Sequence, residues 1–457
     1  MVKISSLFKY QFLLEPLQYF LIEAHPIPNF YLGRLISILI IVLLIYSNKF
    51  GLLIRSFIKS LTTFPFLPYT LWSVAGGLIA FFNYEELFSK IRFGIIEPSI
   101  YMIFITLFIF LPKLFLRKKI LLKIPKAFLY VFSFVLFLGY LDLIFDYLGF
   151  NLLNRTILDS LDIGPRFHSL ANEPRDYVVA CIYFLASLSI FFVSPLSGNT
   201  FKKYFKFYLI ILIPLAFLSL ILTNSFTFIT TSAIFLIISI FVIIIKSIIF
   251  LFQSKLYRSY SLGMFIVSTL FLSVYLILND SQFLQNFGFE RITRYLDSFD
   301  SLRIYLGEGN SDFINYLTEM DPLLRSQGVT ILPLLEFFSP QNASDIYYQI
   351  VGNGIGSTTE LLKKISEDEI LINSHSQLVR LIYEQGIIGF LFFLYIHFSI
   401  IKNSTLSINS SKLQKSLFFI FSTLLLIAYL VQRRSEYFLF LGLNYLYLNE
   451  IPYKKPV

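Results

Sequence analysis

The residues that could do chemistry lie in two hydrophilic stretches, and His375 is the first of them. It stands in Asn373-Ser374-His375-Ser376, directly ahead of a long apolar segment. A neutral imidazole accepts a proton near pH 7, so His375 is a candidate general base for a sugar hydroxyl. The alternative is a histidine at a helix entry that bonds only to nearby backbone.

Arginines in the same stretches are candidates for binding phosphate. A guanidinium keeps its charge, and its fork matches phosphate oxygens in bidentate fashion. The alternatives are ordinary pairing with the many nearby acids and, for the last arginine, anchoring of a membrane helix. Glu173, before Pro174, either caps the helix that follows or orients an arginine. The candidate arginines are Arg166, Arg291, Arg294, Arg325 and Arg433.

A glycine motif and a pair of histidines suggest cofactor chemistry only weakly. Gly352-x-Gly-x-Gly lacks the strand-loop-helix context of a phosphate-binding loop, so we interpret it as a turn whose N–H groups could face the site. His168 and His375 could both ligate a metal, but no cysteine or tight His/Asp cluster accompanies them. The sequence therefore predicts no metal site and no cofactor.

The elements that must position these residues are membrane helices. The 457-residue chain is 56% hydrophobic and only 14% charged, against about 25% in soluble domains. Apolar stretches long enough to cross about 30 Å of hydrocarbon predict an all-α polytopic bundle of about eleven spans. The expected spans are 32–48, 64–82, 98–116, 127–149, 177–196, 207–223, 226–246, 261–278, 381–401, 416–432 and 437–449.

The loops predict how the bundle is oriented. Alternate loops, such as 113–126 and 202–206, carry clustered Lys and Arg, which mark the cytoplasmic side. This charge placement argues against nucleic acid as a partner, despite the net charge of +9. Four regions follow: an interfacial N-terminal helix (1–30), eight spans (31–278), an outer loop domain (279–378) and C-terminal spans (379–457). The N-terminus is then expected outside and the C-terminus inside.

The outer loop 279–378 is predicted to be a helical domain that carries function. It holds 14 acidic against 6 basic residues, and its apolar runs are too short to span a membrane. A structured segment of this length between spans is usually functional.

Taken together, these motifs resemble a known family. Many spans, a long outer loop, a Gly-x-Gly turn before His375, and Glu384-Gln385-Gly386-Ile387-Ile388-Gly389 opening a membrane helix resemble the O-antigen polymerases (Wzy) and the related O-antigen ligases. Arg166 and Glu173-Pro174 resemble a segment of the polymerases. One departure is Phe226, because many relatives carry a serine-arginine pair near this position.

The resemblance implies a metal-independent, inverting glycosyltransferase of class C-like fold in the bacterial inner membrane. It implies that His375 is catalytic and that Arg166, Arg325 and Arg291 bind the pyrophosphate of undecaprenyl-linked oligosaccharides, with Glu173, Arg294 and Arg433 in support. A chain-length regulator protein is an expected partner. The alternatives are an O-antigen ligase that transfers to lipid A-core, a transporter or flippase, and a structural or signalling membrane protein.

Overall fold

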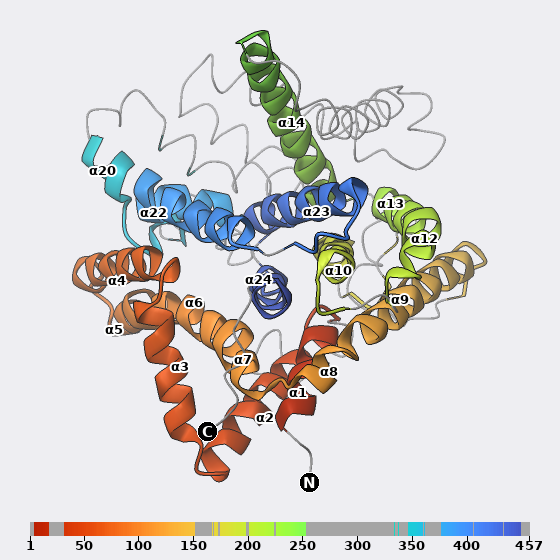
Figure 1. Ribbon diagram of the computed structural model, residues 1–457. Helices are drawn as coiled ribbons and strands as arrows, with labels where there is room; N and C mark the ends of the chain where they lie inside the picture. The colour runs from red at the N-terminus through yellow and green to blue at the C-terminus, as the bar shows by residue number, and fades with distance from the viewer. Residues whose placement is uncertain are drawn as a thin grey trace.

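The described part of the chain is built from helices and contains no strand (Figure 1). The computed structural model describes residues 4–17, 32–150, 167, 169–171, 174–197, 201–223, 225–252, 333, 337, 346–359, 361, 376–404, 406–432 and 434–448. Its elements are α1 (Ile4–Leu14), α2 (Leu32–Tyr46), α3 (Phe50–Thr62), α4 (Phe66–Asn83), α5 (Leu87–Ile91), η1 (Arg92–Ile96), α6 (Glu97–Ile105), η2 (Thr106–Phe110), α7 (Leu111–Phe115), α8 (Lys118–Leu121), α9 (Ile124–Tyr147), α10 (Pro174–Val193), α12 (Phe205–Phe207), η3 (Tyr208–Leu212), α13 (Ile213–Leu222), α14 (Phe226–Phe252), α20 (Ile346–Val351), α22 (Gln377–Lys402), α23 (Lys412–Val431) and α24 (Glu436–Tyr447).

Membrane character is confirmed by the length and composition of these helices. Seven helical stretches of the described residues are long and apolar enough to cross a bilayer. Two shorter apolar helices, Arg34–Tyr46 and Thr227–Val242, overlap further predicted spans. The expected span 261–278 lies outside the described residues. The seven stretches are Phe66–Asn83, Leu87–Phe115, Lys118–Tyr147, Pro174–Val193, Phe205–Leu222, Gln377–Lys402 and Lys412–Val431.

Two of these stretches, Leu87–Phe115 and Phe205–Leu222, contain three π-helical turns between them, and a proline follows each turn by two residues. Proline has no N–H to donate, and its ring clashes with the carbonyl one turn earlier, so the helix widens locally instead of ending. The helices therefore stay continuous across the bilayer. The pairs are η1 before Pro98, η2 before Pro112 and η3 before Pro214.

Two helices, α10 and α24, form the centre of the bundle (Figure 1). Every residue of α10 except Arg175 is buried, as expected for a helix that is apolar on all sides and enclosed by other helices. The short helix α24 approaches η2 closely, because a Cβ at Gly442 would overlap the carbonyl oxygen of Phe108. These two helices consequently fix the positions of the helices around them.

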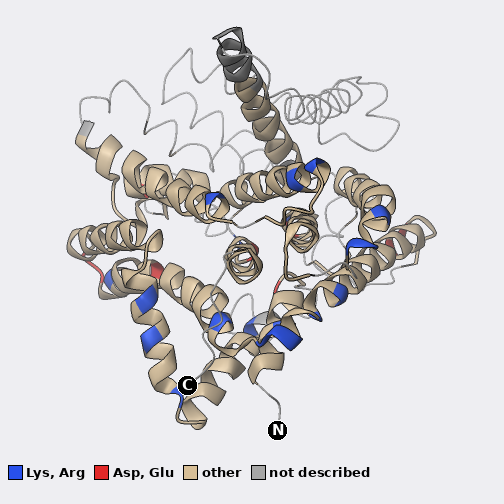
Figure 2. Ribbon diagram, in the orientation of Figure 1, with Lys and Arg blue, Asp and Glu red and all other residues tan. Residues whose placement is uncertain are grey.

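Several basic residues lie at junctions between helices. Figure 2 shows Lys and Arg in blue along α3, around α8 and on α12, whereas the long helices are mostly tan. Lys49 lies over the ring of Phe115, with its Nζ 5.8 Å from the ring centroid. Lys113 makes a comparable contact with Tyr445, at 4.5 Å. We refer to the part of the bundle that includes Lys49 and residues 113–123 as the basic end.

Helix α1, which was expected to be interfacial, packs its side chains into the bundle. Phe8 and Phe12 are fully buried, and Phe8 stacks on Phe115 of the basic end with ring centroids 5.8 Å apart. At the other end of α1, Glu15 accepts a hydrogen bond from Ser435 at 3.1 Å. Helix α1 therefore runs inward from the basic end. The expectation of an N-terminus on the opposite side required that this helix lie on the surface.

Candidate functional site

The starts of α10, α22 and α24 meet at one end of the bundle, which we call the site end. Ser376, directly before α22, donates to the carbonyl of Leu430 in the last turn of α23, at 3.2 Å. Ser435, directly before α24, bonds to Glu15. Together with the ion pair between Arg434 and Asp176 of α10, these contacts bring together the ends of five helices. Along α1, Phe8 contacts the basic end and Glu15, seven residues later, contacts the site end.

An arginine–carboxylate cluster is buried at the site end, formed by Glu97, Thr358, Arg380 and Glu384. The Arg380 Nε donates to Glu384 at 3.2 Å, and its Nη2 lies 3.4 Å from Glu97. Thr358 donates a short hydrogen bond to Glu384. The cluster joins α6, the segment after α20, and α22. Buried ionisable groups among membrane helices are functional candidates, since their desolvation is costly.

The Arg380 cluster combines buried charges of opposite sign. One guanidinium faces two carboxylates, and Arg380 and Glu384 are only 8% and 2% exposed. Both carboxylates hold the guanidinium through Nε and Nη2, so the orientation of Arg380 is fixed. A side chain held in this way loses little entropy when it meets a ligand.

Helix α22 is broken at Gly386, nine residues after its start. Gly386 has φ +68° and ψ −178°, a conformation open to glycine but strained for other residues. The family-like motif Glu384-Gln385-Gly386 was predicted to open a membrane helix. The structure instead places it inside α22, where it separates a first segment (residues 377–385) from the long remainder.

Donors from outside the helix satisfy the carbonyls that the break releases. The N–H groups of Asn353 and Gly354 donate to Tyr383 and Glu384, at 2.9 and 3.0 Å. The indole N–H of Trp72, on α4, donates to the carbonyl of Gln385 at 2.8 Å. Irregular backbone is tolerated at membrane depth when other protein groups meet its hydrogen bonds in this way.

The Gly352-x-Gly-x-Gly segment is a turn, as predicted, and it presses against this break. Gly352, Gly354 and Gly356 have φ values of +89°, +89° and +91°. A Cβ at Gly352 would collide with the backbone of Glu384 and Gly386. The N–H groups of Asn353 and Gly354 are already used by α22. The turn therefore anchors α22, and these two N–H groups are not available to a phosphate.

A second charged group at the site end, the Arg434 cluster, comprises Glu15, Asp176, Arg434, Ser435 and Glu436. Arg434 and Asp176 form an ion pair between the segment before α24 and the first turn of α10. Glu436, at the first position of α24, is fully buried. An acid in the first helical turn is favoured by the helix dipole, but full burial of a carboxylate is not required for that role.

None of the seven predicted site residues can be placed, because all lie outside the described residues. They are His375, Arg166, Arg325, Arg291, Glu173, Arg294 and Arg433, and the second histidine considered for a metal, His168, joins them. Their roles stay predictions. Within the described ranges, no group of three or more His, Cys, Asp or Glu side chains could hold a metal ion.

Sequence reasoning missed Arg380, Glu97 and Thr358. The available signal was Arg380 and Glu384 four residues apart in an apolar segment, a spacing that places both side chains on one helix face. Nothing in the sequence links Glu97 or Thr358 to that pair, since they lie 283 and 26 residues from their partners Arg380 and Glu384.

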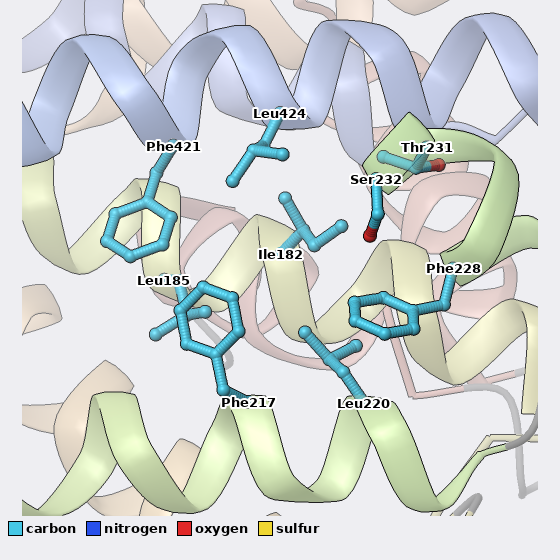
Figure 3. A pocket seen from close by; sticks show the side chains of 9 residues that line it. All are labelled: Ile182, Leu185, Phe217, Leu220, Phe228, Thr231, Ser232, Phe421 and Leu424. Atoms are coloured by element: carbon cyan, nitrogen blue, oxygen red, sulfur yellow. The ribbon is translucent and has the colours of Figure 1, made fainter. Parts of the chain in front are cut away.

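A separate pocket lies between α10, α13, α14 and α23 (Figure 3). Three phenylalanine rings and several aliphatic side chains face it, and its only polar groups are two hydroxyls. No lining side chain can transfer a proton near neutral pH or carry charge, so the pocket offers no group for catalysis. The lining residues are Ile182, Leu185, Phe217, Leu220, Phe228, Thr231, Ser232, Phe421 and Leu424.

The fold defines the class: a helical protein with several membrane-crossing helices and buried charges gathered at one end. Comparison with protein-family models found no match, and neither did comparison with curated protein sequences.

Proposed function

We propose that the protein is an O-antigen polymerase-like glycosyltransferase that joins undecaprenyl-pyrophosphate-linked repeat units at the periplasmic face of the inner membrane. The observation that carries the proposal is the anchoring of the first segment of α22, which begins two residues after His375. Catalysis requires groups held in position before the reaction, and this segment is held from several sides.

The anchoring contacts come from four other elements. Gln377 donates to the hydroxyl of Tyr101 on α6, at 2.7 Å. Ser376 bonds to α23, Arg380 to Glu97, and the carbonyls at the break to Asn353, Gly354 and Trp72. A base mounted at the start of such a segment needs little reorganisation to meet its substrate, which supports the role proposed for His375.

In the proposed reaction, His375 takes the proton of the acceptor hydroxyl while that oxygen attacks the anomeric carbon of the donor sugar. The bond from that carbon to the pyrophosphate oxygen breaks, and the lipid pyrophosphate leaves with the bonding electrons. Arg166, Arg325 and Arg291 stabilise the leaving charge, supported by Arg294, Arg433 and Glu173. Direct displacement inverts the anomeric centre.

The first prediction tests His375. Replacing His375 by Ala should reduce polymer formation by roughly two to four orders of magnitude, the usual contribution of a general base. The measurement is the polysaccharide ladder on a gel, together with turnover of lipid-linked repeat units by the purified protein. Membrane level and thermal unfolding of the variant serve as controls. Polymer of normal length and amount would exclude His375 as the base.

A second candidate function is transport of a lipid-linked anionic substrate. The broken helix α22 with charged groups beside the break favours it, because discontinuous helices with charged groups are frequent in transporters. A deletion strain separates the candidates. Loss of a polymerase leaves single repeat units on lipid A-core. Loss of a ligase or a flippase leaves none, and only loss of a flippase holds the lipid-linked unit on the cytoplasmic side.

A further inference from the structure

Glu436 differs from the other described acidic residues in that both of its carboxylate oxygens are buried without a hydrogen-bond partner from another described residue. It is fully buried, and the nearby donor is the backbone N–H of Glu436 itself. An ionised carboxylate without a donor in an apolar bundle is strongly unfavourable, and such groups are normally neutralised instead. Its burial follows from the central position of α24, which other helices surround (Figure 1).

Charged groups from several elements face Glu436. Arg434 and Arg34 lie within electrostatic reach of its carboxylate, and Glu436 and Glu15 in turn lie within reach of the Tyr183 hydroxyl on α10. Arg434 is paired with Asp176. Other helices bring Tyr101, Tyr429 and His397 against α24, but these contact Phe438 or Tyr437. Glu15, Asp176 and Glu436 therefore lie in one region with Arg34 and Arg434, and Arg175 directly precedes Asp176 on α10.

A buried carboxylate without a hydrogen bond from another described residue favours a positively charged ligand, and the geometry restricts the size of that ligand. A zero exposed fraction at Glu436 leaves no path for a sugar or a hydrated cation without rearrangement. No three His, Cys, Asp or Glu side chains in the described ranges are arranged to hold a metal ion. A proton from solvent water, added to one carboxylate oxygen, is the ligand that fits.

We propose that Glu436 is a proton-binding site, and that Arg434 is shared between Asp176 and Glu436 according to whether that proton is bound. With the proton on Glu436, Arg434 pairs with Asp176, the arrangement seen here. When the proton leaves, Arg434 turns to the new carboxylate charge, two residues away in the chain. The site does not depend on the glycosyltransferase proposal, because it uses none of the residues assigned to that reaction. Arg434 only follows Arg433 in the chain.

Infrared difference spectroscopy of the full-length protein in lipid nanodiscs tests whether the Glu436 carboxyl carries a proton. A protonated buried carboxyl gives a C=O stretch that solvent-exposed, ionised acids lack at neutral pH. We expect one such band in the wild type and its loss in Glu436→Gln, an isosteric change. Glu85→Gln, at an exposed position, is the matched control and should leave the band unchanged. A spectrum unchanged by Glu436→Gln overturns the proposal.

The sharing of Arg434 is tested in the same way. Asp176→Asn releases Arg434 to Glu436, so the band should disappear at neutral pH although Glu436 is present. Arg434→Gln removes the partner of the ionised form, so the band should persist to higher pH than in the wild type. The second variant keeps the test decisive if the first does not fold. A band that responds to neither change overturns the sharing of Arg434.

Discussion

Arg380 shows at the scale of single residues how a buried charge is kept in a membrane bundle. Its guanidinium bonds to Glu384 on the same helix and to Glu97 on another, with N···O distances of 3.2 and 3.4 Å. Removal of one member of a buried ion pair leaves the remaining charges without compensation, which costs more than the pair itself contributes. Replacing one charged residue of this cluster should therefore destabilise the protein more than replacing two residues of opposite charge together.

A stability prediction follows for Arg380. Arg380→Ala should lower the free energy of unfolding by about 3–5 kcal/mol, because Glu97 and Glu384 stay buried without their cation. Thermal unfolding in detergent measures the loss. Arg117→Ala, at an exposed position of the basic end, is the matched control and should change little.

The paired variant distinguishes charge compensation from lost side-chain contacts. Arg380→Gln combined with Glu384→Gln removes both members of the closest pair and should be less destabilising than Arg380→Gln alone. Equal destabilisation by the double and the single variant would contradict a role for charge compensation in this cluster.

At the scale of elements, the break in α22 depends on a close backbone contact between two glycines, which we call the joint. Gly386 and Gly352 lie backbone against backbone, since a Cβ at either would overlap the chain around the other. The joint links the turn after α20 to the first segment of α22, which begins two residues after His375 in the sequence. Its conformation depends on the absence of both side chains.

The joint gives a prediction for Gly386→Ala. The positive φ and the collision with the carbonyl of Ile350 should together cost about 2–4 kcal/mol, and activity should fall with it if residues 377–385 hold His375. Gly51→Ala is the control, because its Cβ meets nothing within 4 Å and helix propensity favours alanine there. A Gly386→Ala protein as stable as the wild type would contradict the claim that the joint has no room for a side chain.

At the scale of the whole molecule, the bundle separates its charges by end. Lys49 and the basic residues of 113–123 lie at the basic end, and the two buried clusters lie at the site end. Because positive residues mark the cytoplasmic side, the site end should face outward. The course of α1, from the basic end inward, then puts the start of the described chain on the cytoplasmic side.

Cysteine labelling tests this orientation. The chain has one cysteine, the buried Cys181, so a Cys181→Ala background can carry single new cysteines. In intact spheroplasts, a membrane-impermeant maleimide should label Tyr347→Cys, an exposed position near the site end, and should not label Asn48→Cys or Ile408→Cys. Both unlabelled positions should react after permeabilisation. The reverse pattern would invert the topology and move both clusters to the cytoplasm.

The sequence by itself determined the class of the molecule. Uninterrupted apolar stretches and few charges are enough to specify membrane helices, because a bilayer selects directly for apolar length. Most helices came within a few residues of their predicted bounds, as for α9, expected at 127–149 and observed at Ile124–Tyr147. The turn at Gly352 was also predictable, since glycine is the residue that adopts positive φ without strain.

Only the tertiary structure decided which charges meet. Arg380 and Glu97 are 283 residues apart, and Ser435 and Glu15 are 420 apart, so no local pattern relates them. The break in α22 was also hidden, because residues 377–402 keep a helical pattern of apolar positions while the donors at the break come from α4 and the turn after α20. Pairing and burial are properties of contacts between distant segments, and those exist only once the helices have assembled.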